Sequence, residues 1–125
     1  MPPILIVDDE ESILFAMREY FTALGYQADC ARELEEAKTL LARTCYAVAV
    51  LDLRLTGSHS TEGLVLLDYI RQHYPATQVI ILTAYGAPQI EQEARRLGVK
   101  AFLHKRLSLP EVAHVVAALH GSQAF

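Results

Sequence analysis

Short apolar runs alternate with longer amphipathic stretches along the chain, and this alternation limits the fold more than any other feature. Each run is rich in Val, Ile, Leu or Ala, and each following stretch has apolar residues at helical spacing. Strands that alternate with helices in this way build repeated βα units around a parallel sheet. The sequence therefore predicts an α/β fold made of five such units.

The boundaries of these units follow from the apolar runs and from the residues that end helices. We expect strands at 3–7, 26–30, 47–51, 79–82 and 101–103. The second run is more polar than the others, which is typical of a strand at the edge of a sheet. Helices should follow: one ending at Gly25, then 32–42, Glu62 or Gly63 to just before Pro75, Pro88 to Gly98, and 109–120.

Two local patterns make the first and last helices well defined. In the first, a single apolar face is expected, made by Leu14, Met17, Phe21 and Leu24. The last should begin at a capping box, because Ser108 and Glu111 have the S-x-x-E spacing in which each residue satisfies a main-chain amide of the other.

Length and charge exclude several classes of protein. A chain of 125 residues with 52% hydrophobic residues fits one globular domain, residues 1–125. A net charge of -4 argues against binding nucleic acid through the overall field. The first residues lack the basic stretch of a signal peptide, and no apolar run approaches the roughly 20 residues of a membrane helix. We expect a cytoplasmic domain with no membrane contact, and we expect Cys30 and Cys45 to be reduced and mostly buried.

Polar side chains stand directly after the expected strands. Asp8 and Asp9 follow the first strand, Asp52 follows the third, Thr83 follows the fourth and Lys105 lies just past the fifth. In a parallel sheet all carboxyl ends lie at one edge, which is where α/β proteins keep their sites. Each residue alone is explained by a helix cap, a turn or the surface. Their joint placement predicts a single crevice.

The chemistry of this set favours phosphoryl transfer. Two carboxylates about 4 Å apart repel by roughly 1 kcal/mol in water and about 4 kcal/mol at an effective dielectric near 20. A hard divalent cation such as Mg²⁺ would relieve that repulsion. A threonine hydroxyl can donate to an oxyanion and a lysine ammonium suits phosphate. One aspartate could then act as a nucleophile and form an acyl phosphate.

Four segments at these positions resemble the receiver domain of two-component response regulators. They are Ile-Leu-Ile-Val-Asp-Asp-Glu at 4–10, Leu-Asp-Leu-Arg-Leu at 51–55, Leu-Thr-Ala-Tyr-Gly at 82–86 and Phe-Leu-His-Lys at 102–105. Order and spacing match over nearly the whole chain. The resemblance implies a flavodoxin-like (βα)5 fold with strand order 2-1-3-4-5 and helices on both faces of the sheet.

The resemblance also implies an activity and its residues. Asp52 would accept a phosphoryl group from a sensor histidine kinase or phosphotransfer protein. Mg²⁺ would be held by Asp9, Asp52 and the carbonyl of Arg54, with Asp8 acting mainly through water. Such a domain catalyses its own phosphorylation and dephosphorylation and is not a turnover enzyme.

A conformational switch is implied as well. Thr83 and Lys105 would contact the phosphoryl oxygens, and Phe102 would turn inward on activation. The output would then reach a downstream effector protein or domain through the face made by the fourth helix, fifth strand and fifth helix. The last helix could also pair two molecules as a homodimer.

Two segments depart from the family pattern. Arg106 follows Lys105 where receivers usually have proline, and because a cis bond without proline costs about 2.5 to 4 kcal/mol, we expect a trans bond there. The loop after Asp52 has Thr56 in place of the common proline and is longer than usual over 57–63. His59 in that loop is expected to be an exposed histidine.

Three other functions are alternatives to this interpretation. Asp52 and Thr56 have the D-x-x-x-T spacing of haloacid-dehalogenase-like phosphatases, but Arg54 stands where that family needs an aspartate. A flavin or nucleotide module is disfavoured because the acidic loop after the first strand would repel phosphate. A degenerate receiver that serves only as a protein docking module remains the open alternative.

Overall fold

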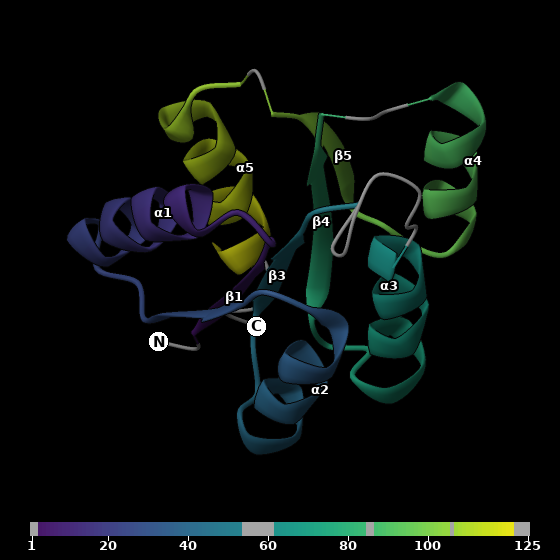
Figure 1. Ribbon diagram of the computed structural model, residues 1–125, viewed down its shortest axis with the longest axis horizontal. Coiled ribbons are helices and arrows are strands. Elements are labelled where there is room, and N and C mark those ends of the chain that lie inside the picture. The colour runs from purple at the N-terminus through teal and green to yellow at the C-terminus, as the bar shows by residue number, and fades with distance from the viewer. Residues whose placement is uncertain (1–2, 54–61, 85–86, 106, 122–125) are drawn as a thin grey trace.

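The computed structural model describes residues 3–53, 62–84, 87–105 and 107–121. The expectations for Arg54, Thr56, His59 and the Lys105–Arg106 bond therefore lie outside the described residues. Within them, five parallel strands form one sheet in the order β2-β1-β3-β4-β5, which confirms the predicted α/β fold and strand order (Figure 1). The strands are β1 Ile4–Val7, β2 Ala28–Ala31, β3 Val48–Leu51, β4 Gln78–Thr83 and β5 Ala101–His104.

The pairing register brings the strand ends level at one edge of the sheet. Val7 of β1 pairs with Leu51 of β3, so the residue that follows each strand is an aspartate at the same height. Thr83, the last residue of β4, pairs with His104, the last of β5. The sheet alone thus gathers the polar residues that follow β1, β3 and β5.

Five helices among the described residues cover both faces of the sheet, as predicted. They are α1 Glu11–Ala23, α2 Leu34–Arg43, α3 Glu62–His73, α4 Pro88–Arg96 and α5 Leu109–Gly121. In Figure 1, α1 and α5 lie on one face and α2, α3 and α4 on the other. Alternate strand residues face the two layers, because side chains in a strand point to opposite sides in turn. The central strands are therefore apolar throughout, and β1 and β3 are buried at every position.

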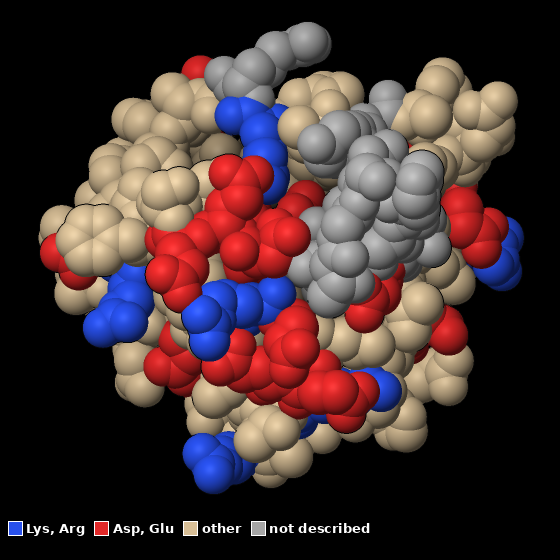
Figure 2. All heavy atoms as spheres, viewed as in Figure 1, with Lys and Arg blue, Asp and Glu red and all other residues tan. Residues whose placement is uncertain are grey.

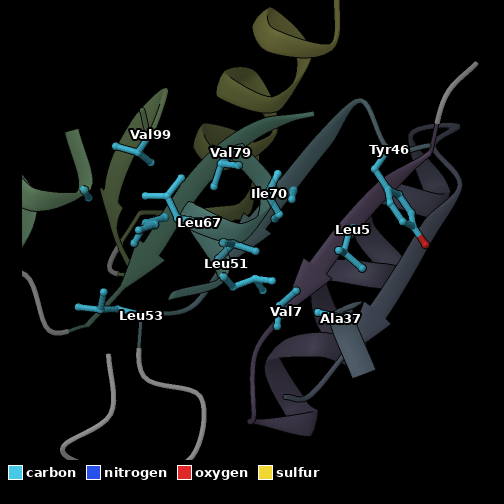
Figure 3. Close-up of a cluster of buried hydrophobic side chains, with 14 of the residues drawn as sticks. Leu5, Val7, Ala37, Tyr46, Leu51, Leu53, Leu67, Ile70, Val79 and Val99 are labelled. Carbon is cyan, nitrogen blue, oxygen red and sulfur yellow. The ribbon is translucent and has the colours of Figure 1, made fainter. Parts of the chain in front are cut away.

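Two hydrophobic clusters result, one on each side of the sheet. The cluster under α2, α3 and α4 includes Leu5, Leu51, Leu67, Ile81 and Phe102, and part of it is drawn in Figure 3. The cluster under α1 and α5 includes Ile4, Ile6, Met17, Phe21 and Val116. Burial of apolar surface on both sides, at roughly 25 cal/mol per Å², is what fixes the sheet and so the positions of the strand ends.

The C-terminal end of the first helix shows that one residue expected in the core is not buried. The helical spacing predicts Leu24 on the buried face of α1, but 51% of its surface is exposed. It is the residue after the last helical turn, and Gly25 follows with a φ of 99°, so the chain turns away from the core there. The amide of Tyr26 donates to the carbonyl of Phe21 at 3.0 Å, which completes a Schellman motif.

Two smaller expectations have opposite outcomes. The capping box is confirmed, because Ser108 N donates to Glu111 Oε1 at 3.2 Å and Glu111 N donates to Ser108 Oγ at 3.3 Å. The expectation of two mostly buried thiols is wrong for Cys45, which is exposed, whereas Cys30 is half-buried. No helix among the described residues has the length and apolar character needed to cross a membrane.

Candidate functional site

The site lies at the carboxyl ends of the strands, where the main chain continues the sheet pattern for one more residue. Asp8 N donates to Ala31 O at 3.1 Å, Asp52 N to Val7 O at 2.8 Å, and Lys105 N to Thr83 O at 3.0 Å. These bonds fix the backbone of three site residues relative to the neighbouring strands. Asp8 and Asp52 are only 3% and 4% exposed, and Thr83 is fully buried.

Lys105 joins the carboxylates that come from separate strands. Its Nζ lies 2.8 Å from Asp8 Oδ2, 3.5 Å from Asp52 Oδ2 and 4.0 Å from Glu10 Oε1. Burial lowers the pKa of Lys105, but the hydrogen bond to Asp8 and the charges of Asp8, Asp52 and Glu10 outweigh it, so the pKa is raised. The ammonium group is thus held charged between two buried carboxylates.

Three acidic residues form a group beside this ammonium. One carboxylate oxygen each from Asp8, Asp9 and Glu10 lies within 4.8 Å of the others. Glu10 N donates to Asp8 Oδ1 at 3.0 Å, which orients the buried member, while Asp9 and Glu10 are exposed. Figure 2 shows acidic side chains gathered next to basic ones near the middle of one face.

The donor atoms of this group fit Mg²⁺. They are carboxylate oxygens, which suit hard cations and suit soft metals poorly. The buried Asp8 and Asp52 supply negative charge from the protein side, and the exposed Asp9 and Glu10 leave room for the water that Mg²⁺ retains. The carbonyl of Arg54, expected as a further ligand, lies outside the described residues.

Thr83 and Phe102 share one face of the sheet. Phe102 pairs with Ile81, and Thr83 lies two residues beyond Ile81, so all three point to the side of α2, α3 and α4. Phe102 is 7% exposed and belongs to the core cluster on that side. The aromatic ring therefore already has an inward position, in the layer beneath Thr83.

A hollow of about 270 Å³ adjoins the site between α1 and α5. Its walls are mostly apolar and include Ile13, Met17, Leu107 and Val112, and Lys105 lies at its border. Lys105, whose ammonium group contacts Asp8 and Asp52, is thus also a wall residue of this hollow.

Sequence reasoning missed two residues that shape this site. From the sequence, Glu10 is expected only to repel phosphate, yet it belongs to the acidic group and lies near Lys105 Nζ. Its place in a run of four acids, Asp8 to Glu11, is the available signal. From the sequence, Gly63 is expected only to mark a helix boundary, but it packs directly on the main chain of Asp52 and Leu53. Nothing in the sequence indicates that contact.

Comparison with known proteins identifies the family. A family model described as the response regulator receiver domain matches residues 4–117. The chain belongs to this family. It is 34% identical over 113 residues to the response regulator protein PilR of Pseudomonas aeruginosa, covering 90% of this chain and 25% of PilR. It is 30% identical to the photosynthetic apparatus regulatory protein RegA of Cereibacter sphaeroides, covering 92% of this chain and 61% of RegA. The receiver domain described here thus spans only part of these relatives.

Solved structures agree with the fold of this receiver domain. A CheY-like receiver domain protein from Methanospirillum hungatei superposes with a TM-score of 0.91 at 21% identity, covering 98% of this chain and 96% of that one. The Francisella response regulator 1452 receiver domain gives 0.86 at 27% identity, with 98% of both chains covered. A response regulator from Burkholderia pseudomallei with a phosphorylated aspartic acid gives 0.83 at 21% identity, covering 99% of this chain and 74% of that one.

Proposed function

We propose that this receiver domain accepts a phosphoryl group on Asp52 from the phosphohistidine of a sensor kinase or phosphotransfer protein, in a Mg²⁺-dependent reaction. The observation that carries the proposal is the buried Asp52 carboxylate, 3.5 Å from Lys105 Nζ and at the same sheet edge as the acidic group. The phosphorylated aspartic acid of the similar Burkholderia protein supports it.

In the transfer step an oxygen of Asp52 attacks the phosphorus, and the phosphorus–nitrogen bond to the donor histidine breaks. The bonding electrons stay on the imidazole, which takes a proton from solvent, and Asp52 becomes an acyl phosphate. Lys105 would contact the phosphoryl oxygens and offset their charge. The apolar hollow beside Lys105 offers a surface on which a donor protein could pack.

Asp9, Asp52 and the Arg54 carbonyl would hold Mg²⁺, with Asp8 acting mainly through water. The bound ion would neutralise charge on the transferred oxygens. Asp8 also holds Lys105 through the 2.8 Å ion pair. Water attacking the acyl phosphate at the same site would reverse the modification, so the domain acts on itself and has no external substrate to turn over.

Thr83 and Phe102 would convert phosphorylation into a surface change. A phosphoryl group adds roughly -1.5 to -2 charge and three acceptor oxygens, so it would attract the Thr83 hydroxyl. Because Phe102 lies in the layer beneath Thr83, that shift would stabilise the inward position of the ring. The change would reach an effector protein or domain through α4, β5 and α5, a face that could also pair two molecules.

We further propose that residues 1–125 act as one receiver domain in the cytoplasm, without direct contact to nucleic acid or membrane. The net charge of -4 supports the absence of nucleic acid binding. The second candidate is a degenerate receiver used only for docking, which the departures at Arg106 and over 57–63 favour.

Intact-mass measurement after incubation with acetyl phosphate and Mg²⁺ tests the proposal. A small donor should reach Asp52, because Ala84 beside Thr83 is small and exposed. We expect the wild type and Glu33→Gln, a control at an exposed carboxylate, to gain one phosphoryl group, and Asp52→Asn to gain none. An unmodified wild type, or a gain that persists in Asp52→Asn, would contradict the proposal.

Titration with Mg²⁺ and beryllofluoride separates the active receiver from the docking module. The active domain should show amide chemical-shift changes around Thr83 and Phe102, since the proposal has Thr83 contact the phosphoryl group and Phe102 respond to Thr83 on the same face of the sheet. Spectra that do not change at these residues would favour the docking module.

A further inference from the structure

Gly63, in the first turn of α3, lies unusually close to the main chain that follows β3. A Cβ at this position would stand 2.4 Å from the carbonyl oxygen of Asp52, 2.6 Å from Leu53 Cα and 2.9 Å from Leu53 O. Gly63 N also donates to Leu53 O at 3.0 Å. The start of the helix and the backbone of the phosphoacceptor are therefore in direct contact.

Position 63 holds glycine because a side chain has no room there, and not because the backbone conformation requires it. Gly25 and Gly98 have φ values of 99° and 98°, in the left-handed region that favours glycine. Gly63 lies outside that region, and it is buried. Its three close neighbours are main-chain atoms, which cannot rotate away as the end of a flexible side chain can.

Both partners in this contact are fixed from other sides. Asp52 N is bound to Val7 O at 2.8 Å, and the Leu53 side chain is fully buried in the same cluster as Leu66 and Leu67 of α3. A side chain at position 63 would have to push its neighbour from 2.4 Å to ordinary contact beyond 3.4 Å, a displacement of about 1 Å. That displacement would fall on the residue that carries the carboxylate.

We propose that Gly63 is a positioning residue for the phosphoacceptor. By lacking a side chain it lets α3 lie against the Asp52 carbonyl, and so keeps the Asp52 carboxylate in register with Lys105 Nζ, 3.5 Å away. The inference rests on the proposed phosphorylation of Asp52 and adds that the first turn of α3 sets its rate.

The test compares Gly63→Ala with Gly25→Ala, which serves as the matched control. Alanine at position 25 is strained by the positive φ but meets nothing within 4 Å, so it lowers stability without touching the site. The phosphorylation rate with acetyl phosphate and Mg²⁺ is measured per folded molecule, with the folded fraction taken from circular dichroism. Because a 1 Å misplacement can cost roughly 10²-fold in rate, we expect Gly63→Ala to be at least about ten-fold slower.

The kinetic parameter that changes distinguishes a positioning role of Gly63 from a general loss of folded structure. Gly63 touches Asp52 and not the donor, so the maximal rate should fall while the half-saturating acetyl phosphate concentration stays unchanged. Gly25→Ala should keep the wild-type rate per folded molecule. A Gly63→Ala protein that matches Gly25→Ala in both parameters would overturn the inference.

A measurement on the wild type keeps the test decisive if Gly63→Ala does not fold. Phosphorylation of Asp52 should change the hydrogen-exchange rate of the Gly63 amide, which donates to Leu53 O, and leave that of the Gly25 amide unchanged. If phosphorylation changed the exchange rates of both amides equally, or of neither, coupling between α3 and the phosphoacceptor would be contradicted. A wild type that is not phosphorylated at all would refute the proposed function instead.

Discussion

Replacing Lys105 by methionine should strongly destabilise the metal-free protein. Methionine keeps much of the length and apolar character of the side chain and removes only the charge. Asp8 and Asp52, 3% and 4% exposed, then lose the cation that lies 2.8 and 3.5 Å from their oxygens. The variant therefore tests whether the buried carboxylates depend on this ammonium for compensation.

The magnitude follows from the geometry. At an effective dielectric near 20 the two attractions are about 6 and about 5 kcal/mol in gross terms, and most of this is offset by the cost of burying the charges. Removing one partner of a buried pair typically costs about 3 to 5 kcal/mol. Because the Lys105 side chain is 16% exposed and water can reach the site, we expect about 3 kcal/mol.

Urea denaturation in EDTA at pH 7 measures this loss, with Lys100→Met, at an exposed lysine, as the control. With an m-value near 1.5 kcal/mol/M, about 3 kcal/mol lowers the midpoint by roughly 2 M. Lys100→Met should unfold at the wild-type midpoint. Added Mg²⁺ should stabilise Lys105→Met more than wild type, since the ion supplies the missing positive charge.

The same variant predicts a pH dependence. The folded-state pKa of Lys105 is raised above its ordinary value of 10.5, so its contribution to stability is fully present below that pH and is lost as the pH rises through the higher folded value. The stability difference between wild type and Lys105→Met should be constant near neutral pH and shrink above about 10.5. A variant as stable as wild type in EDTA, or a difference unchanged at high pH, would refute the reasoning.

Two further substitutions test local contacts by urea denaturation. Ser108→Ala removes the capping box of α5 and should cost about 1 kcal/mol, and an unchanged midpoint would mean that the cap contributes nothing. Tyr46→Phe removes the 2.6 Å hydrogen bond that the Tyr46 hydroxyl donates to Asp29 Oδ2 and should cost about 1.5 to 3 kcal/mol. A smaller loss than that of Ser108→Ala would contradict the assignment of a charge-assisted bond.

Much of the fold could be predicted because local signals and burial agree. The runs at Ile4–Val7 and Val48–Leu51 are apolar at every position, as strands covered on both faces must be. Local chemistry was equally informative at the start of α5, where Ser108 and Glu111 form the expected cap. Leu24 shows the limit, because periodicity continues past the point where Gly25 turns the chain out of the helix.

The candidate site was predicted in part. Since parallel strands end at one edge, Asp8, Asp52, Thr83 and Lys105 could be assigned to a common crevice from their positions alone. Which atoms meet could not be assigned. The ion pair of Lys105 with Asp8, closer than that with Asp52, depends on side-chain geometry across β1, β3 and β5.

The order of residues along the chain determined the βα repeat, because apolar residues recur with periods of two and about four residues, and it put polar residues directly after the strands. Tertiary structure alone decided the contacts between segments remote in sequence. It placed Gly63 against the carbonyl of Asp52 and held Lys105 between two buried carboxylates. Such contacts depend on how α3 and β5 dock on the sheet, and docking is set by the packing of the whole core, which no local pattern encodes.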